Sequence, residues 1–218
     1  MEQQLMSLNL YFLRHGQTAF SRDNIFSGCG SDPELTDAGL AMAQAFTDSY
    51  RAIEWRAVYT SPLKRTVATA RPLCEAIGTA MALRDGLREI SYGQWEGLTV
   101  EEVKRKFPDD YARFLSDAAR YPPSGGESAL TLADRAMRVV EEIRQSVTDG
   151  NVLIVSHKAT IRALLCRLLG IDLSQFRYRL ACPVASVSVV EWTAQGPLLK
   201  VLADRSHLSE TLKQLPGT

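Results

Sequence analysis

Residues 8–16 read Leu-Asn-Leu-Tyr-Phe-Leu-Arg-His-Gly. The first six residues form a short, mostly apolar and aromatic run, which predicts a buried strand. The run ends at Arg14-His15-Gly16, so a basic pair and a glycine stand where the strand passes into a loop. A second stretch repeats this plan, because the apolar residues Leu153-Ile154-Val155 are followed by Ser156 and His157. The chain therefore places a histidine after each of two buried strands.

The rest of the chain alternates helical and strand patterns. Thr36 is a suitable cap for a helix that reaches about Tyr50, and Ser61 with Pro62 fits the N-cap and first position of a second helix, in which Pro72 predicts a kink or a fresh start. Helical spacing also marks residues 100–107, 110–118, 128–147 and 158–169, the last closed by Gly170. Further strands are predicted at residues 57–60, 152–156, 184–192 and 198–203.

This order of elements predicts an α/β fold. Strands separated by helices favour a single domain over residues 1–218, with a mostly parallel central sheet and helices on both faces. The segment from about residue 98 to 126 mixes short helices with turn signals such as Tyr121-Pro122-Pro123-Ser124-Gly125-Gly126. We expect it to be an inserted helical segment or lid.

Composition narrows the class of protein. Of the 218 residues 45% are hydrophobic, and 25 basic residues balance 25 acidic ones, so we expect neither nucleic acid nor a membrane as a partner. No apolar run near the start is long enough for a membrane span or a signal peptide, which predicts a cytoplasmic protein. The four cysteines, Cys29, Cys74, Cys166 and Cys182, form no Cys-x-x-Cys pair, so neither a disulfide framework nor a zinc site is indicated.

The two strand-end histidines point to a ligand site. In open α/β sheets ligands bind beyond the carboxyl ends of the strands, where His15 and His157 are predicted to lie. Arg14 adjoins His15, and Arg65 lies at the start of the second helix, where exposed backbone N–H groups also favour an anion. Two guanidinium groups and a helix N-terminus are typical of a phosphate site.

Four motifs then follow one another in a familiar order. They are Leu13-Arg14-His15-Gly16-Gln17-Thr18, Ser61-Pro62-Leu63-Lys64-Arg65-Thr66, Arg88-Glu89-Ile90-Ser91-Tyr92-Gly93-Gln94-Trp95-Glu96-Gly97, and Ser156-His157. From about Leu10 to His207 the chain resembles the histidine phosphatase superfamily, which includes the cofactor-dependent phosphoglycerate mutases. The resemblance implies a phosphoglycerate mutase-like fold.

The resemblance also implies roles for the motif residues. His15 would accept the phosphoryl group, Arg14, Arg65 and His157 would bind its oxygens, and Glu89 would donate a proton. Phosphoryl transfer depends mainly on in-line positioning and on positive charge around the equatorial oxygens, which agrees with these roles. An alkoxide is a poor leaving group, so a carboxyl group such as Glu89 must protonate it.

Substrate contacts are expected on two loops and at the second histidine. The resemblance suggests Gln17 and Thr18 near the phosphate, although support of the turn is nearly as good an explanation. Many family members carry Asn six residues after the nucleophile, where this chain has Ser21, with Asn24 three positions on. The loop that contains Ser27 and Gly28 is expected to line the specificity pocket. The expected substrate-binding residues are Gln17, Thr18, Ser21, Asn24, Ser27, Gly28 and Lys158.

Lys158 replaces the glycine that usually follows the second histidine in this family. It places a cation at the mouth of the site, and we expect it either to bind a second anionic group of the substrate or to face solvent. His207 has no strand-end setting, and a structural or lid-closing role is favoured for it.

The sequence thus predicts a phosphoric monoester hydrolase of the histidine acid phosphatase type, working without metal or cofactor. Candidate substrates are phosphoserine, sugar phosphates and phosphoglycerate-type esters. A phosphoglycerate mutase, which returns the phosphoryl group to the substrate, is the alternative, and a non-catalytic phosphate-ester binding protein is a more remote one. Metal-dependent hydrolysis finds no ligand spacing to support it. Apolar positions on the last strands would permit a homodimer.

Overall fold

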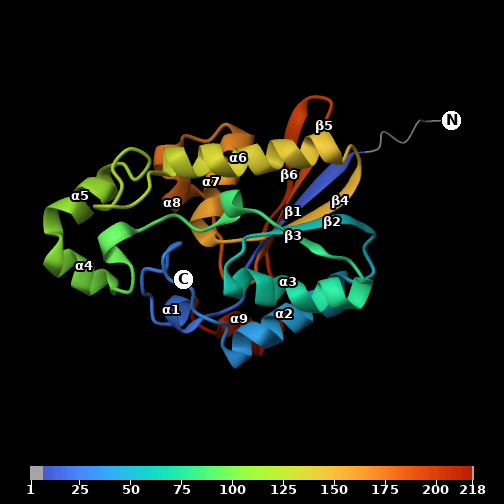
Figure 1. Ribbon diagram of the computed structural model, residues 1–218, viewed down its shortest axis with the longest axis horizontal. Coiled ribbons are helices and arrows are strands. Elements are labelled where there is room, and N and C mark those ends of the chain that lie inside the picture. The colour runs from blue at the N-terminus through green and yellow to red at the C-terminus, as the bar shows by residue number, and fades with distance from the viewer. Residues whose placement is uncertain (1–6, 218) are drawn as a thin grey trace.

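The computed structural model describes residues 7–217, and a six-stranded sheet forms its centre (Figure 1). The strands are β1 Leu8–Arg14, β2 Trp55–Thr60, β3 Met81–Leu83, β4 Gly150–Ser156, β5 Val187–Thr193 and β6 Gly196–Asp204. Their order is β3-β2-β4-β1-β5-β6. The first four in this order run parallel, while β5 is antiparallel to both β1 and β6. The predicted mostly parallel sheet is confirmed.

Helices lie on both faces of the sheet. The α-helices are α1 Ala19–Arg22, α2 Asp37–Tyr50, α3 Lys64–Ile77, α4 Val100–Lys106, α5 Pro108–Ser116, α6 Ala129–Ser146, α7 Lys158–Leu169, α8 Phe176–Arg179 and α9 Glu210–Gln214. In Figure 1, α6 and α7 lie on one face of the sheet and α2 and α3 on the other. The pairs α2·α3 and α6·α7 pack against each other. Residues 1–6 and 218 of the predicted domain lie outside the described part.

Two apolar clusters hold the layers together. Leu10 and Phe12 of β1 belong to the cluster shared with α6 and α7, whereas Leu13 belongs to the cluster that includes Phe46 of α2 and Leu73 of α3. Successive strand residues point to opposite faces, so a strand covered on both sides needs apolar residues at every position. This is why the apolar runs at residues 10–13 and 152–155 form the centres of the most buried strands.

Three predicted helix ends are confirmed. The side chain of Thr36 accepts a hydrogen bond from Gly39 N at the start of α2, and Ser128 does the same for Thr131 N at the start of α6. At the end of α7, Gly170 adopts a left-handed conformation with φ of 68°, which glycine reaches without steric cost.

The start of α3 corrects the prediction. The helix begins at Lys64 with Leu63 as its N-cap, and Ser61 and Pro62 stay outside it. Its interior contains Pro72 without a fresh start, so that part of the expectation was wrong, while a kink at Pro72 stays a prediction. The carbonyl that Pro72 leaves without a helical donor belongs to Ala68, and both residues are partly exposed, which lets water satisfy the carbonyl.

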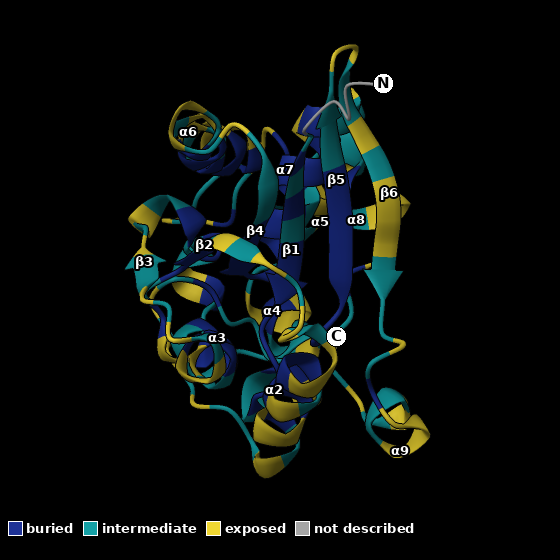
Figure 2. Cartoon of the chain, turned by 90° about the vertical axis from the view of Figure 1, so that its right-hand side faces the viewer, coloured by how far each residue is buried: buried dark blue, intermediate teal, exposed yellow. Residues whose placement is uncertain are grey.

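The expected inserted segment contains α4 and α5, which lie together at one end of the molecule (Figure 1). It is anchored by Phe114, whose ring meets Trp95 edge-on with centroids 5.1 Å apart. That it acts as a lid stays a prediction. At the edge of the sheet away from β3, strand β6 has exposed and intermediate residues only (Figure 2), with Leu198, Val201 and Leu202 at its surface. Within residues 7–217 no helix combines the length and apolar character needed to span a membrane.

Candidate active site

The site lies at the carboxyl ends of three neighbouring parallel strands. His15 follows β1, Ser61 follows β2 and His157 follows β4, and these strands are adjacent in the order β2-β4-β1. Backbone hydrogen bonds continue past the strand ends, from His15 N to Ser156 O and from Ser61 N to Val155 O, both 3.1 Å. The sheet therefore fixes the three side chains relative to one another, and the rings of His15 and His157 come within 5.3 Å between centroids.

The geometry of His15 suits a nucleophile. Its Nδ1 lies 2.8 Å from the carbonyl oxygen of Gly16, and a carbonyl can only accept, so Nδ1 carries the proton. The lone pair of the neutral ring is then on Nε2. Burial, followed by the positive charges of Arg65 and Arg14, lowers the pKa of His15 well below 6.5. The imidazole is therefore neutral at physiological pH.

The loop after His15 depends on two glycines. A Cβ on Gly16 would lie 2.5 Å from Gly39 O, and a Cβ on Gly39 would collide with Gln17 O. Their close approach packs the start of α2 against the backbone beside His15, while Gly16 N donates to Thr69 Oγ1 at 3.0 Å. Helices α2 and α3 thus fix the loop that follows His15.

His157 is held by a buried guanidinium group and a hydroxyl. Arg65 Nε donates to His157 Nδ1 at 3.2 Å, which leaves the proton of the neutral ring on Nε2, facing Ser61 Oγ at 2.8 Å. Burial is the main cause that lowers the pKa of His157 well below 6.5, followed by the charges of Arg65, His15 and Arg14. His157 is therefore a neutral hydrogen-bond donor.

Both arginines predicted for phosphate binding are fixed by backbone carbonyls. Arg65, only 1% exposed, donates to Ser31 O at 2.9 Å and to Gly28 O at 3.1 Å. Arg14 donates to Cys182 O at 2.8 Å and is 3% exposed. Asp32 Oδ1 also lies 3.8 Å from Arg65 Nη1, so Arg65 takes part in an ion pair as well. Gly28 acts through its carbonyl, by positioning Arg65.

Glu89 occupies a cradle of donors at the start of α7. Its Oε1 accepts from Ile90 N at 2.9 Å and from Thr160 N and Oγ1 at 3.2 and 3.1 Å, and its Oε2 accepts from Ala159 N at 3.1 Å. The side chain is 5% exposed, and Arg88 pairs with Asp85 instead at 2.7 Å. Glu89 is thus a buried carboxyl oriented by the helix N-terminus, and not a surface partner of Arg88.

The backbone that carries Glu89 is held from α6. Arg135 donates to Arg88 O at 2.8 Å and to Glu89 O at 3.0 Å, and also to Gly86 O at 2.8 Å. The guanidinium of Arg135 is itself fixed by Glu127, 2.7 Å away. These contacts fix the position of the carboxyl from a residue outside the cavity.

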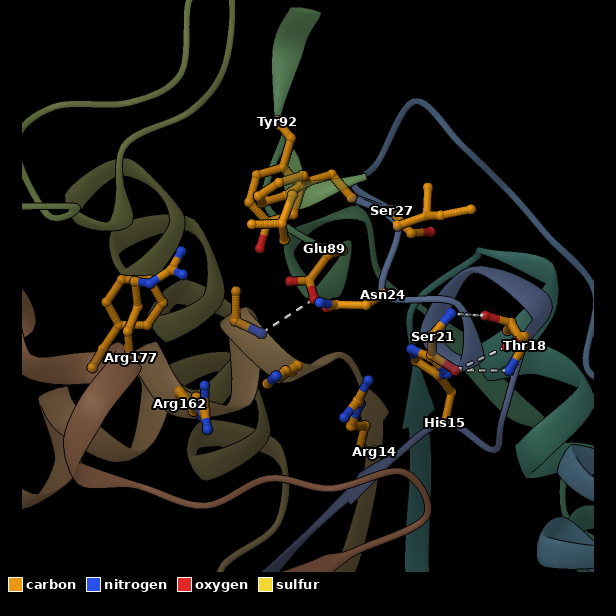
Figure 3. Close-up of a pocket in the computed structure, with 16 residues that line it drawn as sticks. Arg14, His15, Thr18, Ser21, Asn24, Ser27, Glu89, Tyr92, Arg162 and Arg177 are labelled. Atoms are coloured by element: carbon orange, nitrogen blue, oxygen red, sulfur yellow. Dashed lines mark hydrogen bonds between the residues drawn. The ribbon is translucent and has the colours of Figure 1, made fainter. Parts of the chain in front are cut away.

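A cavity of about 150 Å³ opens in front of His15 and Glu89 (Figure 3). The predicted residues that line it are Arg14, His15, Thr18, Ser21, Asn24, Ser27, Glu89 and Lys158. Thr18 and Ser21 also cap each other's backbone at the start of α1. Pockets for drug-sized ligands measure roughly 300–1,000 Å³, so this one suits a small molecule.

Arg65, His157 and Gly28 do not line this cavity, and neither do Gln17 and His207. Gln17 donates from Nε2 to Pro216 O and accepts from Thr36 Oγ1 at 2.8 Å, so its amide ties the loop to α2 and to the C-terminal segment. His207 packs edge-on against Phe46 and Tyr50, with centroids 5.7 Å apart in each case. Both arrangements fit structural roles.

Several residues of the site were not expected from the sequence. Ser61 was expected as a helix cap, yet its hydroxyl faces His157. Arg162 and Arg177 line the cavity together with Tyr92. The position of Arg162 was within reach, because four residues after Lys158 it shares the same face of a helix. Arg177, from the short helix α8, gave no comparable signal.

Comparisons with known proteins agree with this geometry. A model of the histidine phosphatase superfamily (branch 1) matches residues 10–205. Phosphoserine phosphatase 1 of Hydrogenobacter thermophilus is 32% identical over 203 residues, covering 93% of this chain and 95% of that protein. Glucosyl-3-phosphoglycerate phosphatase of Mycolicibacterium vanbaalenii is 32% identical over 174 residues, covering 77% and 76%.

A solved structure, described as Bacillus stearothermophilus YhfR, matches with a TM-score of 0.87 at 27% identity and covers 93% of this chain and 100% of that one. The match of the family model spans both strand-end histidines, Arg65 and Glu89. The chain belongs to the histidine phosphatase superfamily, branch 1.

Proposed function

We propose that this protein is a metal-independent phosphatase that hydrolyses small phosphorylated metabolites through a phosphohistidine on His15. The observation that carries the proposal is the hydrogen bond from His15 Nδ1 to Gly16 O, which leaves the Nε2 lone pair as nucleophile beside Arg14, Arg65 and His157. Two cationic donors, Arg14 and Arg65, and one neutral donor, His157, then surround the oxygens of the transferred phosphoryl group, as phosphoryl transfer requires.

In the first step, Nε2 of His15 attacks phosphorus and the bond from phosphorus to the ester oxygen breaks. Glu89, in its protonated form, gives its proton to that oxygen, so an alcohol leaves. The cradle of amides from α7 receives the resulting carboxylate without movement, because the hydrogen bonds to both oxygens already exist.

In the second step, water attacks phosphorus from the side the alcohol has left, and the phosphorus–nitrogen bond breaks. The Glu89 carboxylate takes the proton of the water, which returns Glu89 and His15 to their starting forms and releases inorganic phosphate. A mutase would instead exclude water and return the group to a substrate hydroxyl.

The neutral state of His15 also supports activity in mild acid. Its pKa lies well below 6.5 because of burial first and the two arginines second, so the nucleophile stays unprotonated at pH values where a free histidine would be charged. That the enzyme is of the histidine acid phosphatase type stays a prediction, which an activity profile from pH 4.5 to 9 tests.

The substrate range is proposed from the cavity and from the relatives. Thr18, Ser21, Asn24 and Ser27 line the small cavity and are proposed to contact the ester. One relative is named a phosphoserine phosphatase and another a glucosyl-3-phosphoglycerate phosphatase. Phosphoserine, sugar phosphates and phosphoglycerate-type esters therefore remain the candidates for this chain.

The test follows phosphate release and isomerisation together. Purified protein in a chelator is incubated with phosphoserine, 3-phosphoglycerate and sugar phosphates, with His15→Ala as the control. Release of phosphate that disappears in His15→Ala is expected. Isomerisation without release of phosphate would make the protein a mutase. Absence of both activities would favour a non-catalytic phosphate-ester binding protein. Activity that is lost in chelator but restored by Mg²⁺ or Zn²⁺ would overturn metal independence.

Two further proposals concern the protein as a whole. A cytoplasmic location is supported by the four unpaired cysteines among the described residues, as expected in a reducing compartment. A homodimer is supported by the apolar surface of Leu198, Val201 and Leu202 on the edge strand β6. Light scattering on the purified protein tests the second proposal.

A further inference from the structure

Three cations gather on the wall of the cavity that the chemistry described above does not use. Lys158, Arg162 and Arg177 line the cavity with His15. Figure 3 shows Arg162 and Arg177 on the opposite side of the cavity from His15, with Glu89 between the two sides. This wall therefore faces the part of a bound ester that lies away from the reacting phosphorus.

These cations have no anionic partner within the described part of the chain. No side-chain hydrogen bond or ion pair joins Lys158, Arg162 or Arg177 to another of the residues 7–217, and the Nε atoms of both arginines are buried without a hydrogen-bond partner. Arg177 is instead oriented by Phe114, whose ring centroid lies 4.5 Å from the guanidinium carbon. Buried donors are normally hydrogen-bonded, so these donors are suited to an acceptor on a bound ligand.

Holding these charges together is electrostatically unfavourable. Burial, reinforced by Arg14, Arg162 and Arg177, lowers the pKa of Lys158 to about 8, and burial also lowers the pKa of Arg162. Lys158 is moreover the first residue of α7, where the helix dipole disfavours a cation. A structural role would be filled better by neutral side chains at these positions.

Charge balance within the cavity gives the same answer. Glu89 is the one acidic side chain among its described lining residues, and the amides of Ala159 and Thr160 already hold it. The phosphoryl group at His15 is served by Arg14 and Arg65. The three remaining cations thus exceed what a singly phosphorylated, otherwise neutral ester would balance.

We propose that Lys158, Arg162 and Arg177 form a second anion subsite, and that the substrate is a small phosphate monoester with a further carboxylate or phosphate group. The assignment of the reacting phosphoryl group to His15 rests on the proposed function. Lys158 and Arg162, one helical turn apart, bind the second anion from α7, and Arg177 closes on it from α8.

The experiment compares esters that differ in the second anion alone. One pair is 3-phosphoglycerate against glycerol 3-phosphate, and the other is propane-1,3-diyl bisphosphate against 3-hydroxypropyl phosphate. Wild-type kcat/KM is expected to be at least about tenfold higher for the doubly anionic member of one pair, as charge-assisted hydrogen bonds imply. The pair that shows the preference identifies the second anion as carboxylate or phosphate.

Variants assign the preference to these residues. Arg162→Met and Arg177→Met are each expected to lower kcat/KM for the preferred ester about tenfold or more, mainly through KM. For the matching ester without the second anionic group, kcat/KM should change less than about threefold. Arg162→Lys should restore part of the preference. The controls are Arg167→Met, an exposed residue of α7 paired with Asp134 at 2.6 Å, and Arg179→Met on α8.

Absence of a preference in both wild-type pairs overturns the subsite, as does an equal loss for both members of a pair in Arg162→Met and Arg177→Met. If the wild-type protein hydrolyses none of the four esters, the subsite is decided by binding alone. The proposed function fails only if phosphoserine and the sugar phosphates also release no phosphate. Calorimetry with His15→Ala then supports the subsite if an ester with a second anionic group binds at least about tenfold more tightly than the matching ester without it, and overturns the subsite otherwise.

Discussion

Arg65 Nε and His157 Nδ1 are joined by a hydrogen bond of 3.2 Å between two side chains that are almost fully buried. Arginine stays protonated in proteins, so it can only donate, and His157 must accept at Nδ1. The remaining proton of the imidazole is on Nε2 and is directed to Ser61 until an ester provides phosphoryl oxygens. One guanidinium group therefore supplies charge to the site and selects the tautomer of its second histidine.

Replacement of Arg65 by methionine is expected to lower kcat/KM by about 10²–10³, because the phosphoryl group loses a cation and His157 loses its orientation. Steady-state phosphate release measures the loss. Lys64→Met is the matched control, since Lys64 is the exposed neighbour and contacts Glu34 at 3.4 Å. A change below threefold in Arg65→Met would contradict the role given to Arg65.

The lowered pKa of His15 predicts a neutral ring at pH 6. In ¹⁵N NMR of the ligand-free protein, Nδ1 of His15 should carry the proton and Nε2 should show a free lone pair at this pH. An imidazolium signal there would contradict the geometry. Below pH 6.5 the unfolded chain binds a proton at this position that the folded chain does not, so the free energy of unfolding falls as the pH falls. Urea midpoints between pH 7.5 and 5.5 check this sign.

Glu89→Gln tests the proton donor through the leaving group. An alkyl ester needs the proton, and its hydrolysis is expected to slow by about 10²–10⁴. p-Nitrophenyl phosphate has a leaving group that departs as a stable anion, so its rate should fall much less. Circular dichroism confirms that the variant is folded. An equal loss on both esters would assign Glu89 a purely structural role.

Arg135 is expected to act as a positioning residue. Without its hydrogen bonds to Arg88 O and Glu89 O, the carboxyl of Glu89 shifts, and kcat for alkyl esters should fall about tenfold to a hundredfold in Arg135→Met. The smaller loss on p-nitrophenyl phosphate should reappear here, because the affected group is the same acid. Arg138→Met, an exposed substitution one turn further along α6, should leave both rates unchanged.

Lys158 predicts a pH dependence of substrate binding. Because its pKa is lowered to about 8, mainly by burial, the cation is lost as the pH rises through about 8 in the free protein. KM for an ester with a second anionic group should therefore rise above pH 8. KM for the matching ester without that group should stay nearly level. The effect should disappear in Lys158→Met. An unchanged alkaline rise in this variant would place the titrating group elsewhere.

The fold was predictable from sequence where a pattern repeats over many residues. The centres of strands β1 and β4, residues 10–13 and 152–155, are apolar without interruption because both faces of the sheet are covered there. Thr36, Ser128 and Gly170 mark helix ends through local chemistry. The start of α3 was missed by two residues because Ser61 fits a helix cap equally well but is drawn to His157. Strand β3 has three residues, too few to show a period.

The candidate site was predictable where its residues adjoin an element end. His15, His157 and Glu89 lie in motifs with a recognisable order, and the resemblance gave them roles. The donor cradle around Glu89 depends on where α7 begins in space, and Arg177 reaches the cavity from a helix of four residues. Such contacts join segments far apart in the chain, and no local pattern encodes them.

A single turn of α7 combines two tasks that enzymes often keep on separate segments. Ala159 and Thr160 hold Glu89 through their backbone N–H groups, while Lys158 and Arg162 on either side of them face the cavity through their side chains. Backbone groups do not change when side chains are substituted. The choice of substrate can therefore diverge between descendants of this protein by point mutation at Lys158 or Arg162, while the position of the proposed acid, Glu89, is inherited unaltered.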